Sequence, residues 1–231
     1  MVGMLAAGGL LLLAGAGVVM ARGAPEVSLY VWWPSIRRFR RQDEVRPWPA
    51  DAVVLYGSST FRLWTTAEED LAPWPVVNRG FGGARTSDLL AYADRVLGPH
   101  RPRAVVLYVA NDISGSLWDI SPVRAARQFR DLLSTVRRLL PATPVVWLAV
   151  NPTVRRWAVW DRTCELNRRF AEVCGTFEGV HTVSVADDLL SGGRPDPRFF
   201  IEDRLHPSVE GYAVIAAGLR DALRTHAGRP E

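Results

Sequence analysis

The stretch Val53–Ser59, VVLYGSS, joins a run of apolar residues to a turn that contains two serines. An unbroken run of this kind is typical of a strand that is buried on both faces of a parallel sheet. Glycine permits a tight turn after such a strand, and a hydroxyl at the mouth of the sheet is available for chemistry. A lone Gly-Ser-Ser is more often a simple helix N-cap, so the motif needs partners elsewhere in the chain.

Similar apolar runs recur along the chain and alternate with segments of helical spacing. This alternation predicts a three-layer α/β/α, flavodoxin-like fold, in which a five-stranded parallel sheet carries helices on both faces. Ser121 followed by Pro122 is typical of a helix start. Strands are expected at 52–56, 76–78, 104–109, 144–150 and 180–185, and helices at 87–97, 122–140, 157–174 and 208–225.

The composition is that of one globular domain of ordinary size. The chain has 231 residues, of which 48% are hydrophobic and 23% are charged, enough apolar surface to bury a full core. The formal net charge is +4, but every basic residue is Arg, and these are scattered without interleaved aromatic residues. A nucleic-acid partner is therefore not expected.

Disulfide and metal chemistry are not expected either. Cys164 and Cys174 lie within one expected helix, and ten helical residues span roughly 15 Å, which predicts free thiols. No two of the four histidines, and no histidine and cysteine, have the spacing of zinc ligands. We therefore expect no metal and no cofactor.

Residues 1–21 contain no charged side chain and are long enough to cross a bilayer as a helix. A single-pass N-terminal membrane helix is favoured over a cleaved signal peptide, because the apolar run continues past the candidate cleavage site at 14–16. Tyr30, Trp32 and Trp33 follow, and such residues suit a membrane–water interface. Secretion after cleavage is the alternative.

Residues 22–50 are expected to form a juxtamembrane linker, and residues 51–226 the folded domain. Arginines at position 22 and at positions 37–41 follow the apolar segment, which by the positive-inside rule favours a cytoplasmic domain. Exported anchored proteins are common, so the side of the membrane is left open. The arginine cluster suits either anionic lipid headgroups or a solvated linker.

Polar motifs stand where the expected strands end, which is where parallel sheets bind ligands. Residues 78–83, NRGFGG, carry glycines that let backbone N–H groups approach a ligand. Asn111 supplies an amide after the third strand. In DRLHP, residues 203–207, the carboxylate of Asp203 and the imidazole of His206 are three residues apart and can face each other over one turn.

Each motif is weak alone, but together and in this order they resemble the SGNH (GDSL-type) hydrolase superfamily over about residues 52–223. The resemblance implies a catalytic triad and an oxyanion hole that binds the charge on a tetrahedral intermediate. By motif position, the triad is Ser59, Asp203 and His206, and the oxyanion hole comprises Ser59, Gly83 and Asn111.

The flanking residues refine the resemblance and depart from it at two places. FRLW at 61–64 and NRGFGG at 78–83 are similar to the lysophospholipase/esterase-like branch, which has Gly-Ser-Ser in its first motif. Ser58 stands where the family usually has Asp. Ala110 stands before Asn111, where a glycine is common.

The function implied is that of a serine esterase or lipase-like hydrolase, which cleaves acyl esters of lipids or sugars through an acyl-enzyme. Two alternatives are an acyl- or acetyl-transferase with the same triad and a non-catalytic, membrane-tethered binding protein. The acyl group, the alcohol and the oligomeric state are left open.

Other residues offer competing roles. Ser58 is the rival nucleophile, and Asp187 or Asp188 could orient a histidine. Five side chains near expected strand ends are candidates either for a substrate pocket or for ordinary packing: Trp64, Arg155, Arg156, Trp157 and Trp160.

Overall fold

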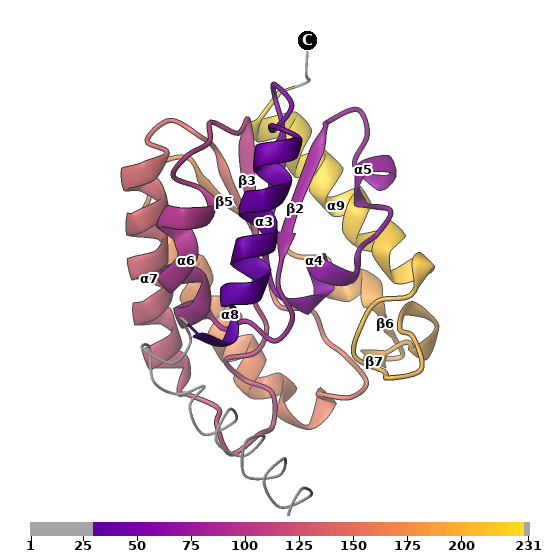
Figure 1. Ribbon diagram of the computed structural model, residues 1–231. Helices are drawn as coiled ribbons and strands as arrows, with labels where there is room; N and C mark the ends of the chain where they lie inside the picture. Colours follow the sequence, from indigo (N-terminus) through magenta and orange to yellow (C-terminus); the bar gives the residue numbers. More distant parts are fainter. Residues whose placement is uncertain (1–29, 229–231) are drawn as a thin grey trace, which may run out of the picture.

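The computed structural model describes residues 30–228, which form three layers around a parallel sheet (Figure 1). The sheet has five strands in the order β2-β1-β3-β4-β5, and each neighbouring pair is parallel. This confirms the predicted α/β class, and the predicted strand ends are within two residues of those observed. The strands are β1 (Val53–Gly57), β2 (Val76–Gly80), β3 (Ala104–Tyr108), β4 (Val145–Leu148) and β5 (Val180–Val183).

Helices cover both faces of this sheet. The long helices are α3 (Trp33–Val45), α6 (Thr86–Val96), α7 (Pro122–Leu139), α8 (Trp160–Cys174) and α9 (Val209–His226). Helices α6, α7 and α8 pack side by side with α3 next to α6, whereas α9 packs against β4 and β5. In Figure 1, α3 lies in front of the sheet and α9 on its far side.

Short elements complete the connections. Helix α7 begins as predicted, because the Ser121 hydroxyl accepts a hydrogen bond from the Arg124 N–H and Pro122 occupies the first helical position. The short elements are α4 (Ser59–Leu63), α5 (Ala67–Asp70), η1 (Trp157–Val159), η2 (Asp187–Leu189), η3 (Pro197–Phe199) and the antiparallel pair β6 (Leu190–Ser191) and β7 (Arg194–Pro195).

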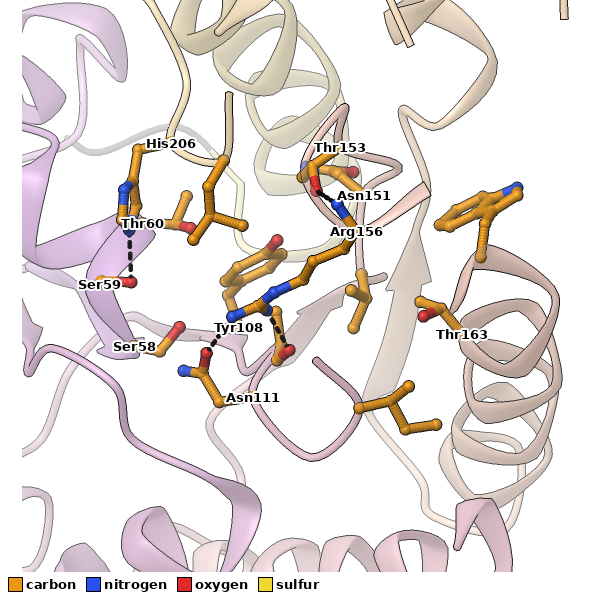
Figure 2. Close-up of a pocket in the computed structure, with 15 residues that line it drawn as sticks. Ser58, Ser59, Thr60, Tyr108, Asn111, Asn151, Thr153, Arg156, Thr163 and His206 are labelled. Atoms are coloured by element: carbon orange, nitrogen blue, oxygen red, sulfur yellow. Dashed lines mark hydrogen bonds between the residues drawn. The ribbon is translucent and has the colours of Figure 1, made fainter. Parts of the chain in front are cut away.

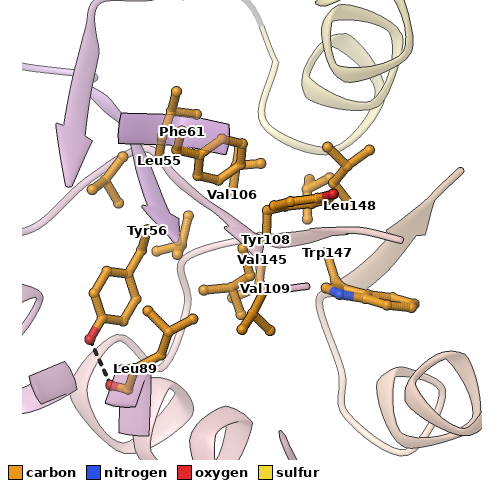
Figure 3. Close-up of a cluster of buried hydrophobic side chains, with 14 of the residues drawn as sticks. Leu55, Tyr56, Phe61, Leu89, Val106, Tyr108, Val109, Val145, Trp147 and Leu148 are labelled. Carbon is orange, nitrogen blue, oxygen red and sulfur yellow. Dashed lines mark hydrogen bonds between the residues drawn. The ribbon is translucent and has the colours of Figure 1, made fainter. Parts of the chain in front are cut away.

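Aromatic side chains fill much of the core. Phe129 of α7 and Phe170 of α8 stack with ring centroids 4.1 Å apart, and both rings contact Trp147 of β4. On the neighbouring part of the sheet, the buried Tyr56 donates its hydroxyl to the carbonyl of Leu89 at 2.6 Å (Figure 3). The core therefore buries large rings while satisfying the polar hydroxyl.

Part of the segment that is expected to be a linker over residues 22–50 is folded onto the domain. Within it, α3 buries Ile36 and Phe39 in the core, and Asp43 pairs with Arg79 of β2. Apolar residues three apart are enough to bury one helix face. Because most residues around Ile36 and Phe39 are arginines, the sequence lacks the longer apolar pattern that would predict a buried helix face.

The expected membrane helix at residues 1–21 lies outside the described residues. Within residues 30–228, no helix combines the length and the apolar character needed to cross a membrane. The Trp32 indole packs against Phe81, which follows β2, with ring centroids 5.7 Å apart. The chain therefore enters the domain at the carboxyl end of the sheet.

Two glycines bring α4 onto the ends of the central strands. Gly57 pairs with Gly80 and with Tyr108, so β1, β2 and β3 end level with one another. A Cβ on Gly57 would lie 2.3 Å from the Tyr108 carbonyl oxygen, and a Cβ on Gly80 would lie 2.3 Å from the Arg62 backbone nitrogen. Because glycine has no side chain, α4 can begin directly at the carboxyl edge of the sheet.

Replacing Gly80 with alanine is expected to lower the free energy of unfolding by about 1–3 kcal/mol, because the added methyl collides with the backbone of α4. Urea unfolding measures this change. Gly175→Ala is the matched control, since an added Cβ there meets its nearest heavy atom at 3.6 Å and φ is −62°. That variant should lose no stability and gain at most about 1 kcal/mol. Equal stability of Gly80→Ala and the wild type would contradict the close packing of α4.

Candidate active site

Polar side chains from four loops, from the first turns of α4 and α8 and from the end of β3 line one pocket at the carboxyl end of the sheet (Figure 2). The loops follow β1, β3 and β4 and precede α9. This is the edge at which the sequence motifs predict a site. The polar lining comprises Ser58, Ser59, Thr60, Tyr108, Asn111, Asn151, Thr153, Arg156, Thr163 and His206.

Ser59, His206 and Asp203 form a continuous chain of hydrogen bonds. The Ser59 hydroxyl oxygen lies 2.8 Å from Nε2 of His206, although 147 residues separate the two in sequence. Nδ1 of the same imidazole lies 2.5 Å from Oδ2 of Asp203. If Nδ1 carries the proton and donates to the carboxylate, Nε2 is free to accept the serine proton. The structure therefore brings the three predicted triad residues together.

The Asp203 carboxylate is held by its own loop. Its Oδ1 accepts hydrogen bonds from the backbone N–H groups of Leu205 and His206, both at 2.9 Å. Arg204 adopts a left-handed φ of 57°, which tightens the turn between them. Burial alone would raise the pKa of Asp203, but these N–H groups and the imidazole together hold that pKa below its usual value. The carboxylate is therefore ionised at neutral pH.

Ser58 and Ser59 differ in what their hydroxyls reach. Ser59 begins α4 and faces the imidazole, whereas Ser58 is buried and its hydroxyl has no hydrogen-bond partner within residues 30–228. Figure 2 shows the imidazole of His206 bonded to Ser59 and not to Ser58. The backbone N–H of Ser58 donates to the Tyr108 carbonyl at 3.0 Å, which fixes the turn. The rival nucleophile therefore lacks a general base.

The three groups that the family resemblance implies for an oxyanion hole lie on this edge. The Ser59 N–H is at the first turn of α4, where helix geometry provides no acceptor within the helix. Gly83 has a φ of +79°, a left-handed conformation that favours glycine. Asn111 donates one amide N–H to the Ala84 carbonyl at 2.8 Å, so the loops after β2 and β3 are in contact.

The structure divides the five candidate pocket side chains. Arg156 and Trp160 line the pocket, and Trp157 stacks on Trp160 with ring centroids 6.1 Å apart. Trp64 is buried in the core, and the Arg155 side chain is exposed to solvent. Trp64 is therefore a packing residue, as the alternative interpretation holds.

Several pocket residues carry no sequence signal. Thr60, Asn151 and Thr153 look like ordinary turn or helix-start residues in the sequence. Thr60 directly follows Ser59, whereas only the fold brings Asn151 and Thr153 into the same pocket. Asp187 and Asp188 lie in η2 with exposed side chains, and Asp203 occupies the place beside the imidazole. In the described part of the chain, no group of three His, Cys, Asp or Glu side chains is arranged to hold a metal ion.

A second carboxylate, Asp112, is fully buried next to Asn111. It accepts hydrogen bonds from the Thr86 hydroxyl at 2.7 Å and from the Thr86 backbone N–H at 3.3 Å. Burial raises the pKa of Asp112 to about 6, and the bonds from Thr86 act in the opposite direction. Asp112 thus ties the loop that carries Asn111 to the start of α6.

Comparisons with known proteins agree with this architecture. Residues 36–214 match the model of the GDSL-like lipase/acylhydrolase family. A provisionally named platelet activating factor from Streptococcus pneumonia has a TM-score of 0.75 at 21% identity, covering 93% of this chain and 98% of its own. A GDSL-like lipase from Bacteroides thetaiotaomicron has a TM-score of 0.69 at 18% identity, covering 82% and 97% of the two chains.

A carbohydrate esterase family 3 protein from Talaromyces cellulolyticus has a TM-score of 0.59 at 15% identity, covering 76% of this chain and 97% of its own. At these identities the solved structures establish a shared fold. No curated protein matches the sequence significantly.

Asp112→Asn is expected to change how stability depends on pH. A carboxyl whose pKa is raised on folding favours the folded state when protonated, and this stability is lost as pH rises from about 4 through 6. Between pH 4.5 and pH 8, the variant should therefore gain about 2 kcal/mol relative to the wild type. Urea unfolding at both pH values measures the difference. Asp188→Asn, at an exposed site, is the control, and a pH-independent difference for Asp112→Asn would contradict the prediction.

Proposed function

The chain belongs to the GDSL-like lipase/acylhydrolase family and is a serine hydrolase that acts on esters, and we propose that it does so through Ser59, His206 and Asp203. The observation that carries this proposal is the 2.8 Å contact between the Ser59 hydroxyl and Nε2 of His206. Nucleophile, base and orienting carboxylate then stand in the arrangement of a serine-hydrolase triad.

In the first half of the reaction, the Ser59 oxygen attacks the ester carbonyl carbon. His206 Nε2 takes the hydroxyl proton as the new C–O bond forms. Asp203, which bonds to Nδ1, stabilises the resulting imidazolium and holds the ring in the required tautomer. The imidazolium then donates the proton to the leaving alcohol as the ester C–O bond breaks, and an acyl-enzyme remains.

The negative charge on the tetrahedral intermediate is proposed to be met by three N–H donors. Two are the backbone N–H groups of Ser59 and Gly83, and the third is the free amide N–H of Asn111. Donors that are already fixed in place stabilise developing charge without reorganisation, and the loss of one typically costs about 10²–10³ in turnover.

In the second half, water attacks the acyl-enzyme, and His206 takes a proton from that water. The carboxylic acid leaves as the proton returns to Ser59. Atoms and charges balance without a cofactor, because the triad provides both the nucleophile and the proton carrier.

The size of the pocket favours a short acyl group. The cavity beside Ser59 has a volume of about 20 Å³, room for roughly one water molecule. Trp160 and Ile113 are among its apolar walls, and Thr153 and Asn151 are polar. A two-carbon acyl chain fits such a space better than a fatty acyl chain does.

Ser59→Ala is expected to lower kcat/KM for p-nitrophenyl acetate by at least about 10⁴-fold, because the nucleophile is removed while the pocket remains. Ser58→Ala is the matched control and should keep activity within about tenfold of the wild type. A fluorophosphonate adduct located by mass spectrometry should fall on Ser59. An adduct on Ser58, or full activity of Ser59→Ala, would refute the mechanism.

Acyl-chain preference tests the size of the pocket. The wild type should hydrolyse p-nitrophenyl acetate with a kcat/KM at least about tenfold above that for p-nitrophenyl octanoate, a change worth about 1.4 kcal/mol or more. Trp160→Ala removes one wall and should shift the ratio toward octanoate. The exposed Trp118 provides the control variant Trp118→Ala. A wild type that prefers octanoate would exclude the short-acyl assignment.

A further inference from the structure

One guanidinium group holds both the backbone and the side chain of the proposed oxyanion loop. Nη1 of Arg156 donates to the Ala110 carbonyl at 2.6 Å, and Nη2 donates to Oδ1 of Asn111 at 2.8 Å (Figure 2). A planar fork with two donors on adjacent nitrogens can bridge two acceptors in fixed geometry, which a lysine ammonium cannot reproduce. Arg156 therefore contacts two consecutive residues at once.

These contacts leave only one orientation for the Asn111 amide. Oδ1 faces an arginine, which can only donate, and Nδ2 faces the carbonyl of Ala84, which can only accept. Turning the amide over would place two donors together at one end and two acceptors together at the other. The second N–H of Nδ2 is therefore fixed in direction as well.

The surroundings of Arg156 are not those of a structural ion pair. Within residues 30–228, no acidic side chain forms a salt bridge with it, and its two described side-chain bonds go to uncharged oxygens. Burial is the main reason that the pKa of Arg156 is lowered. Placing a cation there costs solvation energy, which a carboxylate partner would offset more directly. The guanidinium is instead directed at the loop that carries Ala110 and Asn111.

The loop that carries Arg156 also touches the triad. The Arg155 N–H donates to the Arg204 carbonyl at 2.9 Å, and Arg204 lies between Asp203 and His206. The Arg156 N–H bonds to the hydroxyl of Thr153 at 3.2 Å, which fixes the turn from which the side chain departs. One loop thus joins the triad loop to the loop of Asn111.

We propose that Arg156 is a positioning residue that keeps the free N–H of Asn111 aimed at the reacting carbonyl oxygen. Ala110 stands where the family commonly has a glycine, and Arg156 holds its carbonyl in place. The inference rests on the proposed function, in which Asn111 binds the oxyanion.

The experiment is a double-mutant cycle of Arg156→Met and Asn111→Ala, with steady-state kinetics on p-nitrophenyl acetate. Arg156→Met alone should lower kcat about 10- to 100-fold and leave KM within about twofold, because the amide acts mainly in the transition state. In the Asn111→Ala background, the same change should cost less than about threefold, since no amide remains to be positioned.

Two further variants separate positioning from a general effect of losing an arginine. Arg156→Lys keeps the charge but lacks the fork, so its kcat should stay at least about tenfold below the wild type. If Arg156→Met fails to fold, Arg156→Lys replaces it in the double-mutant cycle. Arg168→Met is the matched control on the surface of α8, where Arg168 pairs with Glu172, and it should have wild-type kinetics.

The outcomes are distinguishable. Independent, multiplicative losses in the cycle, or a fully active Arg156→Lys, would overturn the positioning role while leaving the triad intact. A wild-type kcat for Asn111→Ala would instead remove Asn111 from the proposed oxyanion hole. The proposed mechanism itself is tested separately, by the activity of Ser59→Ala.

Discussion

The position of Ser59 depends on the direct packing of α4 against the ends of β1, β2 and β3. Gly57 and Gly80 make that packing possible, because a side chain at either position would overlap backbone atoms of a neighbour. Asn78 adds polar ties, since its amide N–H donates to the Phe61 carbonyl at 2.6 Å and its oxygen accepts from the Gly80 N–H at 2.9 Å. A short helix of five residues would be marginal alone. Packing and these hydrogen bonds hold it where its first residue meets the imidazole.

The site combines one long-range contact with several short-range ones. Asp203 and His206 are three residues apart, so a single turn can fix their mutual geometry with backbone hydrogen bonds. Ser59 lies 147 residues before His206 in the sequence, and the parallel sheet brings the two together in space. A compact loop therefore suffices to fix Asp203 against His206, whereas placing Ser59 beside them requires a strand, a glycine turn and a helix start.

The fold was predictable from the sequence because a parallel sheet covered on both faces requires apolar runs, and β1 and β3 are buried at every position. The grouping of Ser59, Asp203 and His206 was predictable from the order of their motifs through family resemblance, and periodicity alone could not have paired residues so far apart. Helix α3 was missed because arginines surround the two buried residues Ile36 and Phe39. The contacts of Arg156 leave no sequence trace, since a long side chain that bonds to a backbone carbonyl imposes no spacing on its partner.

The first helix belongs to the same physical unit as the catalytic edge. Asp43 of α3 pairs with Arg79 and accepts the Trp48 indole N–H at 2.6 Å, so the helix and the loop after it are tied to β2 by a largely buried carboxylate. At the other end of α3, the Trp32 ring lies 3.5 Å from where a Cβ on Gly83 would stand. Strand β2, which pairs with α3 through Arg79 and Asp43, leads directly into the turn at Gly83 against which Trp32 packs. Helix α3 and its N-cap residue thus contact both β2 and the Gly83 turn that follows it, so residues that precede β1 pack against the proposed oxyanion turn.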